Sequence, residues 1–108
     1  MRLFRRGGIT PYVQDFFHSL KNLKGKIVVD LPAGAGKMSR VLRDLGANVE
    51  PHDLYPEFFK VEGLTCHPAD LETKLPIPDH HADYILFQEG MEHLPDQLGP
   101  LREFNRIL

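Results

Sequence analysis

The feature that most constrains the fold is a short apolar run that ends in an acid and opens directly into a glycine-rich loop. Ile27-Val28-Val29 is β-branched throughout, which is typical of a strand buried in a parallel sheet. Asp30 ends the run, and the proline and glycines of Leu31–Gly36 form a tight loop. The apolar spacing from Met38 to Leu45 then predicts an amphipathic helix, closed by Gly46. Strand, tight loop and helix in this order indicate an α/β unit.

The rest of the chain continues the alternation of strands and helices. Strands are predicted over 48–52, 64–67 and 83–87, and a last helix over 98–108. Thr10-Pro11 has the residues of a helix start and predicts a leading helix ahead of the first strand. Pro51 is unexpected inside a strand, because proline cannot donate a hydrogen bond to a neighbouring strand. The pattern predicts an α/β fold with a mainly parallel sheet.

Length and charge narrow the class of protein. The 108 residues suffice for one small domain, and 13 basic residues against 15 acidic ones give a net charge of −2, which points to neither nucleic acid nor an anionic membrane as partner. No apolar run approaches the roughly 20 residues of a membrane span. Cys66 is the only cysteine, so we expect no internal disulfide and a cytoplasmic location.

Three acids occupy equivalent places in the predicted sheet. Asp30, Asp53 and Asp70 each stand at or just past the carboxyl end of a strand, where open α/β sheets bind ligands. Gly34 and Gly36 allow a close approach to the backbone, and the following helix directs its positive end toward the same place. We therefore expect amide donors beside a row of carboxylate acceptors.

This combination suits an adenosine that carries both an ammonium and a carboxylate. Loop amides and the helix end would hold the ligand carboxylate, with Asp30 near the ammonium. Asp53 has two oxygens to accept from both ribose hydroxyls. Asp70 could accept from the adenine amino group, while Leu71 supplies a backbone donor and an apolar wall. No element of the pattern requires a phosphate.

Four stretches together resemble class I S-adenosylmethionine-dependent methyltransferases. VVDLPAGAGKMSRVL resembles the first motif of that family, and VEPHDLYPE is similar to the second, with Asp53 at the ribose position. HPADLETKLPIPDHHADYILFQEGMEHLPD matches a later stretch, with Asp70-Leu71 at the adenine position. LREFNRIL resembles a helix that runs into a further strand. The resemblance covers nearly everything from Ile27 to Leu108.

The resemblance implies S-adenosylmethionine as cofactor and methyl transfer to a small-molecule acceptor. It places Gln88 and Glu89 at the end of the fourth strand, facing cofactor and substrate. Glu89 or His93 would act as the base if one is needed; the alternative for His93 is a side chain that caps a turn on a loop before a helix. The residues expected to bind the cofactor are Asp30, Pro32, Ala33, Gly34, Gly36, Asp53, Leu54, Asp70, Leu71 and Gln88.

The implied fold is a Rossmann-like sheet with flanking helices, truncated before its last strands. Within one incomplete domain, residues 1–24 form a leading arm and helix, and residues 25–108 the cofactor-binding core. Pro32 departs from the family, which usually has its first glycine there. Without the further strands, Tyr84–Phe87 is an apolar open edge, which predicts self-association or low stability.

Three alternatives remain open at this point. A truncated methyltransferase fold can serve as a binding module without catalysis. A nicotinamide-dependent dehydrogenase also places Gly34-Ala35-Gly36 before an acid, but Ser39 replaces the third glycine of its fingerprint. The pair His80-His81 suggests a metal site, yet no further ligands have suitable spacing, so we expect solvated side chains and no metal.

Overall fold

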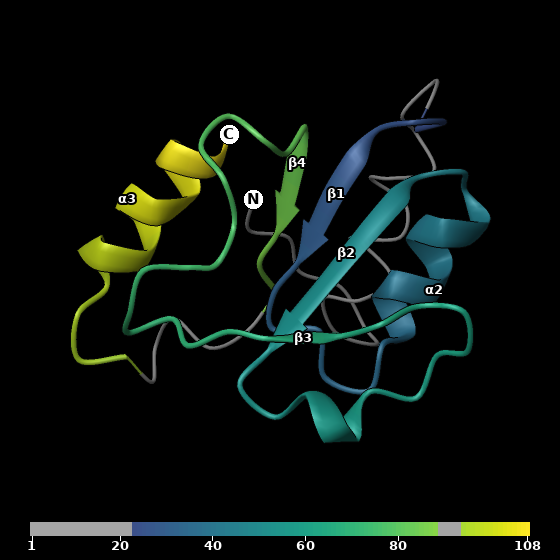
Figure 1. Ribbon diagram of the computed structural model, residues 1–108, viewed down its shortest axis with the longest axis horizontal. Coiled ribbons are helices and arrows are strands. Elements are labelled where there is room, and N and C mark those ends of the chain that lie inside the picture. The colour runs from purple at the N-terminus through teal and green to yellow at the C-terminus, as the bar shows by residue number, and fades with distance from the viewer. Residues whose placement is uncertain (1–22, 89–93) are drawn as a thin grey trace, which may run out of the picture.

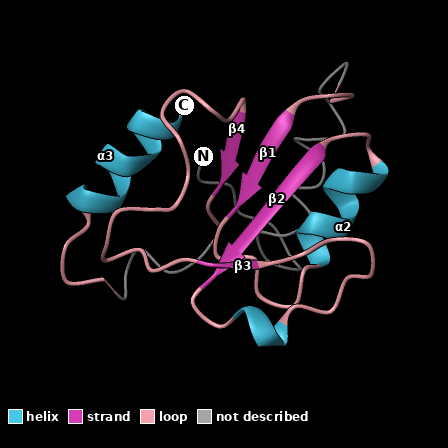
Figure 2. Cartoon of the chain, in the orientation of Figure 1, coloured by secondary structure: helices cyan, strands magenta, loops and turns pink. Residues whose placement is uncertain are grey.

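Parallel strands form the sheet in the computed structural model, which describes residues 23–88 and 94–108 (Figure 1). The strands are β1 (Ile27–Asp30), β2 (Asn48–Asp53), β3 (His67–Pro68) and β4 (Tyr84–Leu86). They lie in the order β3-β2-β1-β4, and every pairing between them is parallel. The helices are α2 (Lys37–Asp44), a 3₁₀ turn η1 (Pro56–Phe58) and α3 (Leu98–Ile107), as Figure 2 shows. The prediction of a mainly parallel α/β sheet with flanking helices is confirmed.

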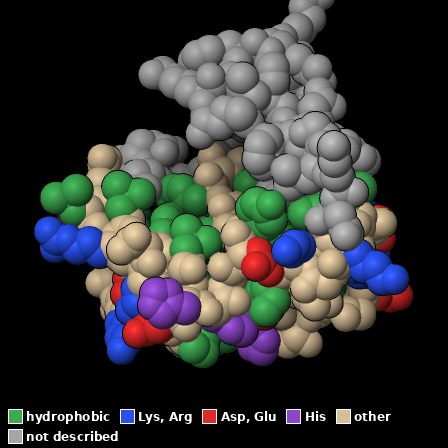
Figure 3. Space-filling view, turned by 90° about the horizontal axis from the view of Figure 1, so that it is seen from above, with side chains coloured by type: hydrophobic (Ala, Val, Ile, Leu, Met, Phe, Trp, Pro, Cys, Tyr) green, Lys and Arg blue, Asp and Glu red, His purple; other side chains and the backbone are tan. Residues whose placement is uncertain are grey.

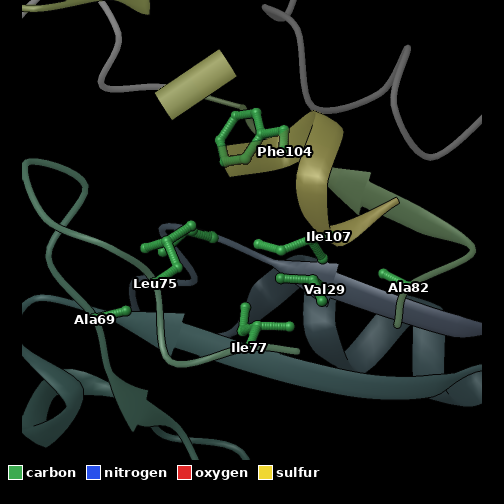
Figure 4. Close-up of a cluster of buried hydrophobic side chains, with 8 residues drawn as sticks. Val29, Ala69, Leu75, Ile77, Ala82, Phe104 and Ile107 are labelled. Atoms are coloured by element: carbon green, nitrogen blue, oxygen red, sulfur yellow. The ribbon is translucent and has the colours of Figure 1, made fainter. Parts of the chain in front are cut away.

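Alternate residues of β1 carry the core on both faces of the sheet. Successive strand residues point to opposite faces, and both Val28 and Val29 are fully buried. Val28 packs in the cluster that contains Met38 and Leu42 of α2. Val29 packs in the cluster that contains Phe104 and Ile107 of α3 (Figure 4). The two helices therefore cover opposite faces.

Polar contacts fix α3 to the loop before β4. The Arg106 guanidinium donates to both carboxylate oxygens of Glu103, to Asp79 Oδ1, and to the carbonyls of Leu75 and Ile77. Glu103 Oε1 in turn accepts from the Leu75 N–H at 2.7 Å. The loop is thereby held against the sheet face that α3 covers.

No helix in the described ranges is long and apolar enough to cross a membrane.

Pro51 is tolerated inside β2 because of the direction in which its nitrogen points. The His52 carbonyl accepts from Ala33 on the β1 side, whereas the Asp53 carbonyl accepts from Ala69 on the β3 side. Backbone polar groups alternate between the two sides of a strand, so the Pro51 nitrogen faces β3. Pairing with β3 begins only at His52, one residue beyond the missing donor.

The same proline explains why the predicted third strand is wrong in extent. The expected strand over 64–67 is reduced to His67–Pro68. Extending β3 toward Thr65 would require a donor at Pro51, which has none. The other elements agree within one residue at each end: β4 covers Tyr84–Leu86, and α2 and α3 match their predicted ranges. The predicted leading helix from Thr10 lies outside the described residues.

Candidate functional site

The carboxyl ends of the strands bring the predicted acids to one edge of the sheet. β1, β2 and β4 run in the same direction, and their arrows all point toward the lower side of Figure 1, where η1 lies. Asp30 is the last residue of β1, and Asp53 is the last residue of β2. Asp70 follows two residues after β3. The structure therefore places the three acids where the sequence predicts them.

The Asp53 carboxylate joins the ends of two strands. Its Oδ2 accepts from the Gly34 N–H at 2.8 Å, and its Oδ1 accepts from the Tyr55 N–H at 2.8 Å. The side chain is 8% exposed. Each carboxylate oxygen can accept about two hydrogen bonds, so each retains one accepting direction. Asp53 thus holds the loop after β1 and keeps capacity for ligand hydroxyls.

The loop itself is stabilised by backbone hydrogen bonds around Ala33. The Ala33 N–H donates to the His52 carbonyl at 2.9 Å, and the Ala33 carbonyl accepts from Gly36 at 3.0 Å. The Leu31–Pro32 peptide bond is cis. Pro32 stands next to Ala33 in this hydrogen-bonded turn. Pro32 and Ala33 are half-buried.

Gly34 and Gly36 have different surroundings. Both have positive φ, 56° and 97°. A Cβ on Gly36 would lie 2.5 Å from a Val61 side-chain atom and 2.6 Å from one of Phe59, whereas a Cβ on Gly34 would meet no atom of residues 23–88 and 94–108 within 4 Å. Gly36 is therefore required for packing, while Gly34 faces open space at the edge of the sheet.

Asp30 is a buried carboxylate with a buried donor. It is 3% exposed, and its Oδ2 accepts from the Ser39 hydroxyl at 2.7 Å. Burial is the main cause that raises the pKa of Asp30, the Ser39 hydrogen bond lowers it, and the charge of Asp53 raises it; together they bring the pKa to about 6. Ser39, in the first turn of α2, was missed as a site residue by the sequence reasoning.

Helix α2 begins beside these carboxylates. Gly36 is its N-cap, and no side chain within the described residues caps that end. The first N–H groups of a helix have no partner inside it and carry a partial positive charge. Amide donors and carboxylate acceptors thus occur at the same edge of the sheet, as predicted.

Asp70 and Leu71 form a turn after β3. Asp70 Oδ1 accepts from the Glu72 N–H at 2.9 Å, and the Asp70 carbonyl accepts from both the N–H and the hydroxyl of Thr73. Leu71 is half-buried and packs against the core on the α3 side. The turn contacts show how Asp70 is held, and its role toward adenine stays a prediction.

The other predicted site residues are less closely tied to the loop. Leu54 is 53% exposed after β2, and Gln88 is half-buried after β4. Glu89 and His93, the predicted catalytic pair, lie outside the described residues.

A group of histidines lies on the α3 face of the sheet at the β2–β3 pairing. His52 is 4% exposed, and neither of its ring nitrogens has a hydrogen-bond partner among the described residues. Burial and the neighbouring His67 lower its pKa. A hollow of about 350 Å³ is lined by these two side chains and Glu50, together with Pro68, Pro76, Ile77 and Pro78.

The prediction of two solvated histidines is wrong for one of them. His80 is exposed, but the half-buried His81 Nε2 lies 2.8 Å from Glu50 Oε1. A contact between residues 31 positions apart cannot be read from the loop composition. No group of metal-binding side chains occurs in the described ranges.

The comparisons with known proteins point to one family. The sequence model of the methyltransferase domain matches residues 29–108. A ubiquinone biosynthesis O-methyltransferase of Xanthomonas oryzae pv. oryzae is 28% identical over 109 residues, 93% of this chain and 46% of that protein. One from Xylella fastidiosa is 31% identical over 100 residues, 82% of this chain and 39% of that protein. The chain spans less than half the length of these curated relatives.

Solved structures have the same fold. A Haloferax volcanii methyltransferase, solved in complex with the Trm112 methyltransferase activator, aligns with a TM-score of 0.75 and 26% identity over 89% of this chain and 46% of that chain. An S-adenosylmethionine-dependent methyltransferase from Mesorhizobium loti aligns with a TM-score of 0.77 and 23% identity, covering 94% and 50% respectively.

We expect Asp30→Asn to stabilise the fold at pH 7.5 and not at pH 4. The folded pKa of about 6 lies above the ordinary 3.8, so the carboxyl contribution to stability is fully present below 3.8 and is lost as pH rises through 6. A difference of about two pKa units corresponds to about 3 kcal/mol. Urea denaturation at the two pH values measures the effect.

The control is Asp44→Asn, because Asp44 is exposed on α2 and should change stability little at either pH. Equal stabilities of wild type and Asp30→Asn at pH 7.5 would contradict the burial of a charged carboxylate at this position.

Proposed function

The chain belongs to the methyltransferase domain family, whose cofactor is S-adenosylmethionine, and from this we propose methyl transfer to a small-molecule acceptor at the carboxyl edge of the sheet. The observation that supports the site most strongly is the Asp53 contact with the glycine loop beside the buried Asp30. It brings hydrogen-bond acceptors and the start of α2 to one place.

The two ends of the site complement the two charges of the cofactor's amino-acid part. The cofactor carboxylate is assigned to the first-turn amides of α2, where a helix favours negative charge. The ammonium is assigned to Asp30, whose carboxylate is buried at the end of β1 and accepts a hydrogen bond from Ser39. No described side chain lies within 4 Å of the Cβ position at Gly34, which leaves the loop backbone open to the cofactor on that side.

The nucleoside part is assigned to the ends of β2 and β3. The Asp53 oxygens retain one accepting direction each after bonding Gly34 and Tyr55, which matches two ribose hydroxyls. Asp70 and Leu71 are assigned to adenine, the first as acceptor and the second as apolar wall. Pro32, Ala33, Gly36, Leu54 and Gln88 complete the proposed cofactor-binding set.

The chain's contribution to the chemistry is mainly to position the reactants. When bound, S-adenosylmethionine would supply a methyl group attached to a positively charged sulfur. An electron pair of the acceptor forms the new bond to the methyl carbon, the carbon–sulfur bond breaks, and the sulfur is left as a neutral thioether. Holding donor and acceptor in line lowers the barrier without a compulsory catalytic side chain. An acceptor that carries a proton must lose it to a base, and we assign that role to Glu89 or His93.

We propose a hydroxyl oxygen of a small molecule as the acceptor. The support is that curated relatives over nearly the whole chain are named as O-methyltransferases of ubiquinone biosynthesis. The net charge of −2 also gives no general attraction for a nucleic-acid acceptor.

Substitution of Gly34 tests the cofactor assignment. Gly34→Ala places a methyl in the open space before the loop, so we expect the chain to fold and to bind S-adenosylhomocysteine at least tenfold more weakly, a loss of about 1.4 kcal/mol. Isothermal titration calorimetry measures the affinity, with NAD titrated in parallel.

Gly25→Ala is the matched control. Gly25 also has positive φ, 76°, and a Cβ there would meet no atom of the described part of the chain within 4 Å, but Gly25 precedes the amino end of β1. The Gly25→Ala variant should lose a similar amount of folding stability, about 1 kcal/mol, because alanine is strained at positive φ. Because Gly25 lies away from the proposed site, the affinity for S-adenosylhomocysteine should not change. Equal affinities in both variants, or wild-type binding to NAD alone, would refute the assignment.

We also propose self-association through the edge of β4. β4 pairs with β1 on one side, and no strand within residues 23–88 and 94–108 pairs with its other side. Leu98, Leu101 and Leu108 on and after α3 are at least half exposed, and hydrophobic side chains gather in a band across the surface shown in Figure 3. An unpaired edge strand is a template for pairing with another chain.

Sedimentation velocity over a range of concentrations tests this proposal. The Leu86 carbonyl accepts from Leu31 on the β1 side, so the neighbouring Ile85 backbone faces away from β1. Ile85→Pro removes an outward donor and should reduce association, whereas Ile85→Ala, which only shortens the side chain, should not. A wild-type chain that is monomeric at every concentration would rule the proposal out.

A further inference from the structure

Ser39 is a fully buried polar residue that the proposed cofactor contacts leave without a role. It is the third residue of α2, with 0% exposure, and its hydroxyl donates to Asp30 Oδ2 at 2.7 Å. We propose that Ser39 is a positioning residue that keeps the Asp30 carboxylate ionised and oriented toward the ammonium of the cofactor. This inference rests on the proposed function.

The backbone of Asp30 is already fixed by the sheet. Asp30 pairs with Pro51 of β2 on one side and with Leu86 of β4 on the other. Only the side-chain torsions therefore remain to be set. The Ser39 hydrogen bond sets them from across the glycine loop, nine residues along the chain. The carboxylate direction is thus coupled to the start of α2, where the cofactor carboxylate is assigned.

The surroundings of Asp30 otherwise disfavour its charge. Burial and the negative Asp53 on β2 both raise the Asp30 pKa, which stands at about 6, and the Ser39 hydrogen bond lowers it. Among the described residues, the Cys66 thiol ahead of β3 also interacts with Asp30, and its pKa of about 11 keeps it neutral between pH 5 and 7.5. Ser39 is therefore the described neighbour that favours the ionised carboxylate.

A purely structural role for Ser39 makes a different prediction. If the hydroxyl only fills space and satisfies a buried group, its loss should lower stability and weaken all ligands alike. A positioning role affects only ligands with an ammonium, and it changes the pH at which they bind. A ligand pair that differs in this group separates the two roles.

The test compares S-adenosylhomocysteine with 5′-methylthioadenosine, which has the nucleoside and sulfur but no amino-acid part. Calorimetric affinities are measured from pH 5 to 7.5 for wild type, Ser39→Ala and Asp30→Asn. In wild type, the affinity ratio of the two ligands should fall as pH drops through about 6, where Asp30 takes up a proton. In Ser39→Ala the midpoint should move upward by about one pH unit, the equivalent of one charge-assisted hydrogen bond.

The variants also provide internal controls. Ser39→Ala should leave the affinity for 5′-methylthioadenosine within twofold of wild type, and Asp30→Asn should remove the pH dependence of the ratio. An unchanged midpoint in Ser39→Ala overturns the inference. If Ser39→Ala does not fold, a flat wild-type ratio between pH 5 and 7.5 overturns it equally.

Failure of this inference is distinguishable from failure of the proposed function. Wild type that binds neither nucleoside contradicts the cofactor site itself. Wild type that binds S-adenosylhomocysteine with an affinity ratio that depends on pH, with the same midpoint in Ser39→Ala, leaves the cofactor site and the Asp30 assignment in place and removes only the role of Ser39.

Discussion

The hydrogen bond from the Gly34 N–H to the Asp53 carboxylate connects the two strand ends on which the candidate site depends. Parallel pairing brings the ends of β1 and β2 to the same edge, but it does not determine the path of the loop between β1 and α2. Asp53 determines that path by holding the loop at Gly34, and Gly36 completes it by packing against Val61 and Phe59. The start of α2 is thereby directed at the carboxylates.

This arrangement has a cost in stability that packing alone would not require. Asp30 is nearly as buried as the valines before it, and a buried carboxylate is destabilising unless it is paired or hydrogen-bonded. One hydroxyl, from Ser39, supplies part of the compensation. A cationic ligand group would supply the rest, so the residual cost is consistent with a site organised for a ligand.

The sequence predicted the local elements well because their signals are local. The bounds of β1 and α2 were predicted within one residue from the β-branched run, the glycine loop and the amphipathic spacing. The parallel topology then predicted that Asp30 and Asp53 lie at the same edge of the sheet. Contacts between distant positions were not predictable. β3 is short because the Pro51 nitrogen faces β3 and cannot donate a hydrogen bond to it. His81 pairs with Glu50, which lies 31 residues away in the sequence. Ser39 was overlooked because a small polar residue in an amphipathic stripe usually faces solvent.

The proposed function requires one ligand surface at the carboxyl edge of the sheet. It is tested most directly by following the backbone amide resonances of the ¹⁵N-labelled chain while S-adenosylhomocysteine is added. We expect the largest shifts at Gly34, Lys37 and Leu71, with little change at Arg106 in α3. Shifts centred instead on His52 and the hollow beside it, or no shifts in a folded chain, would contradict the account.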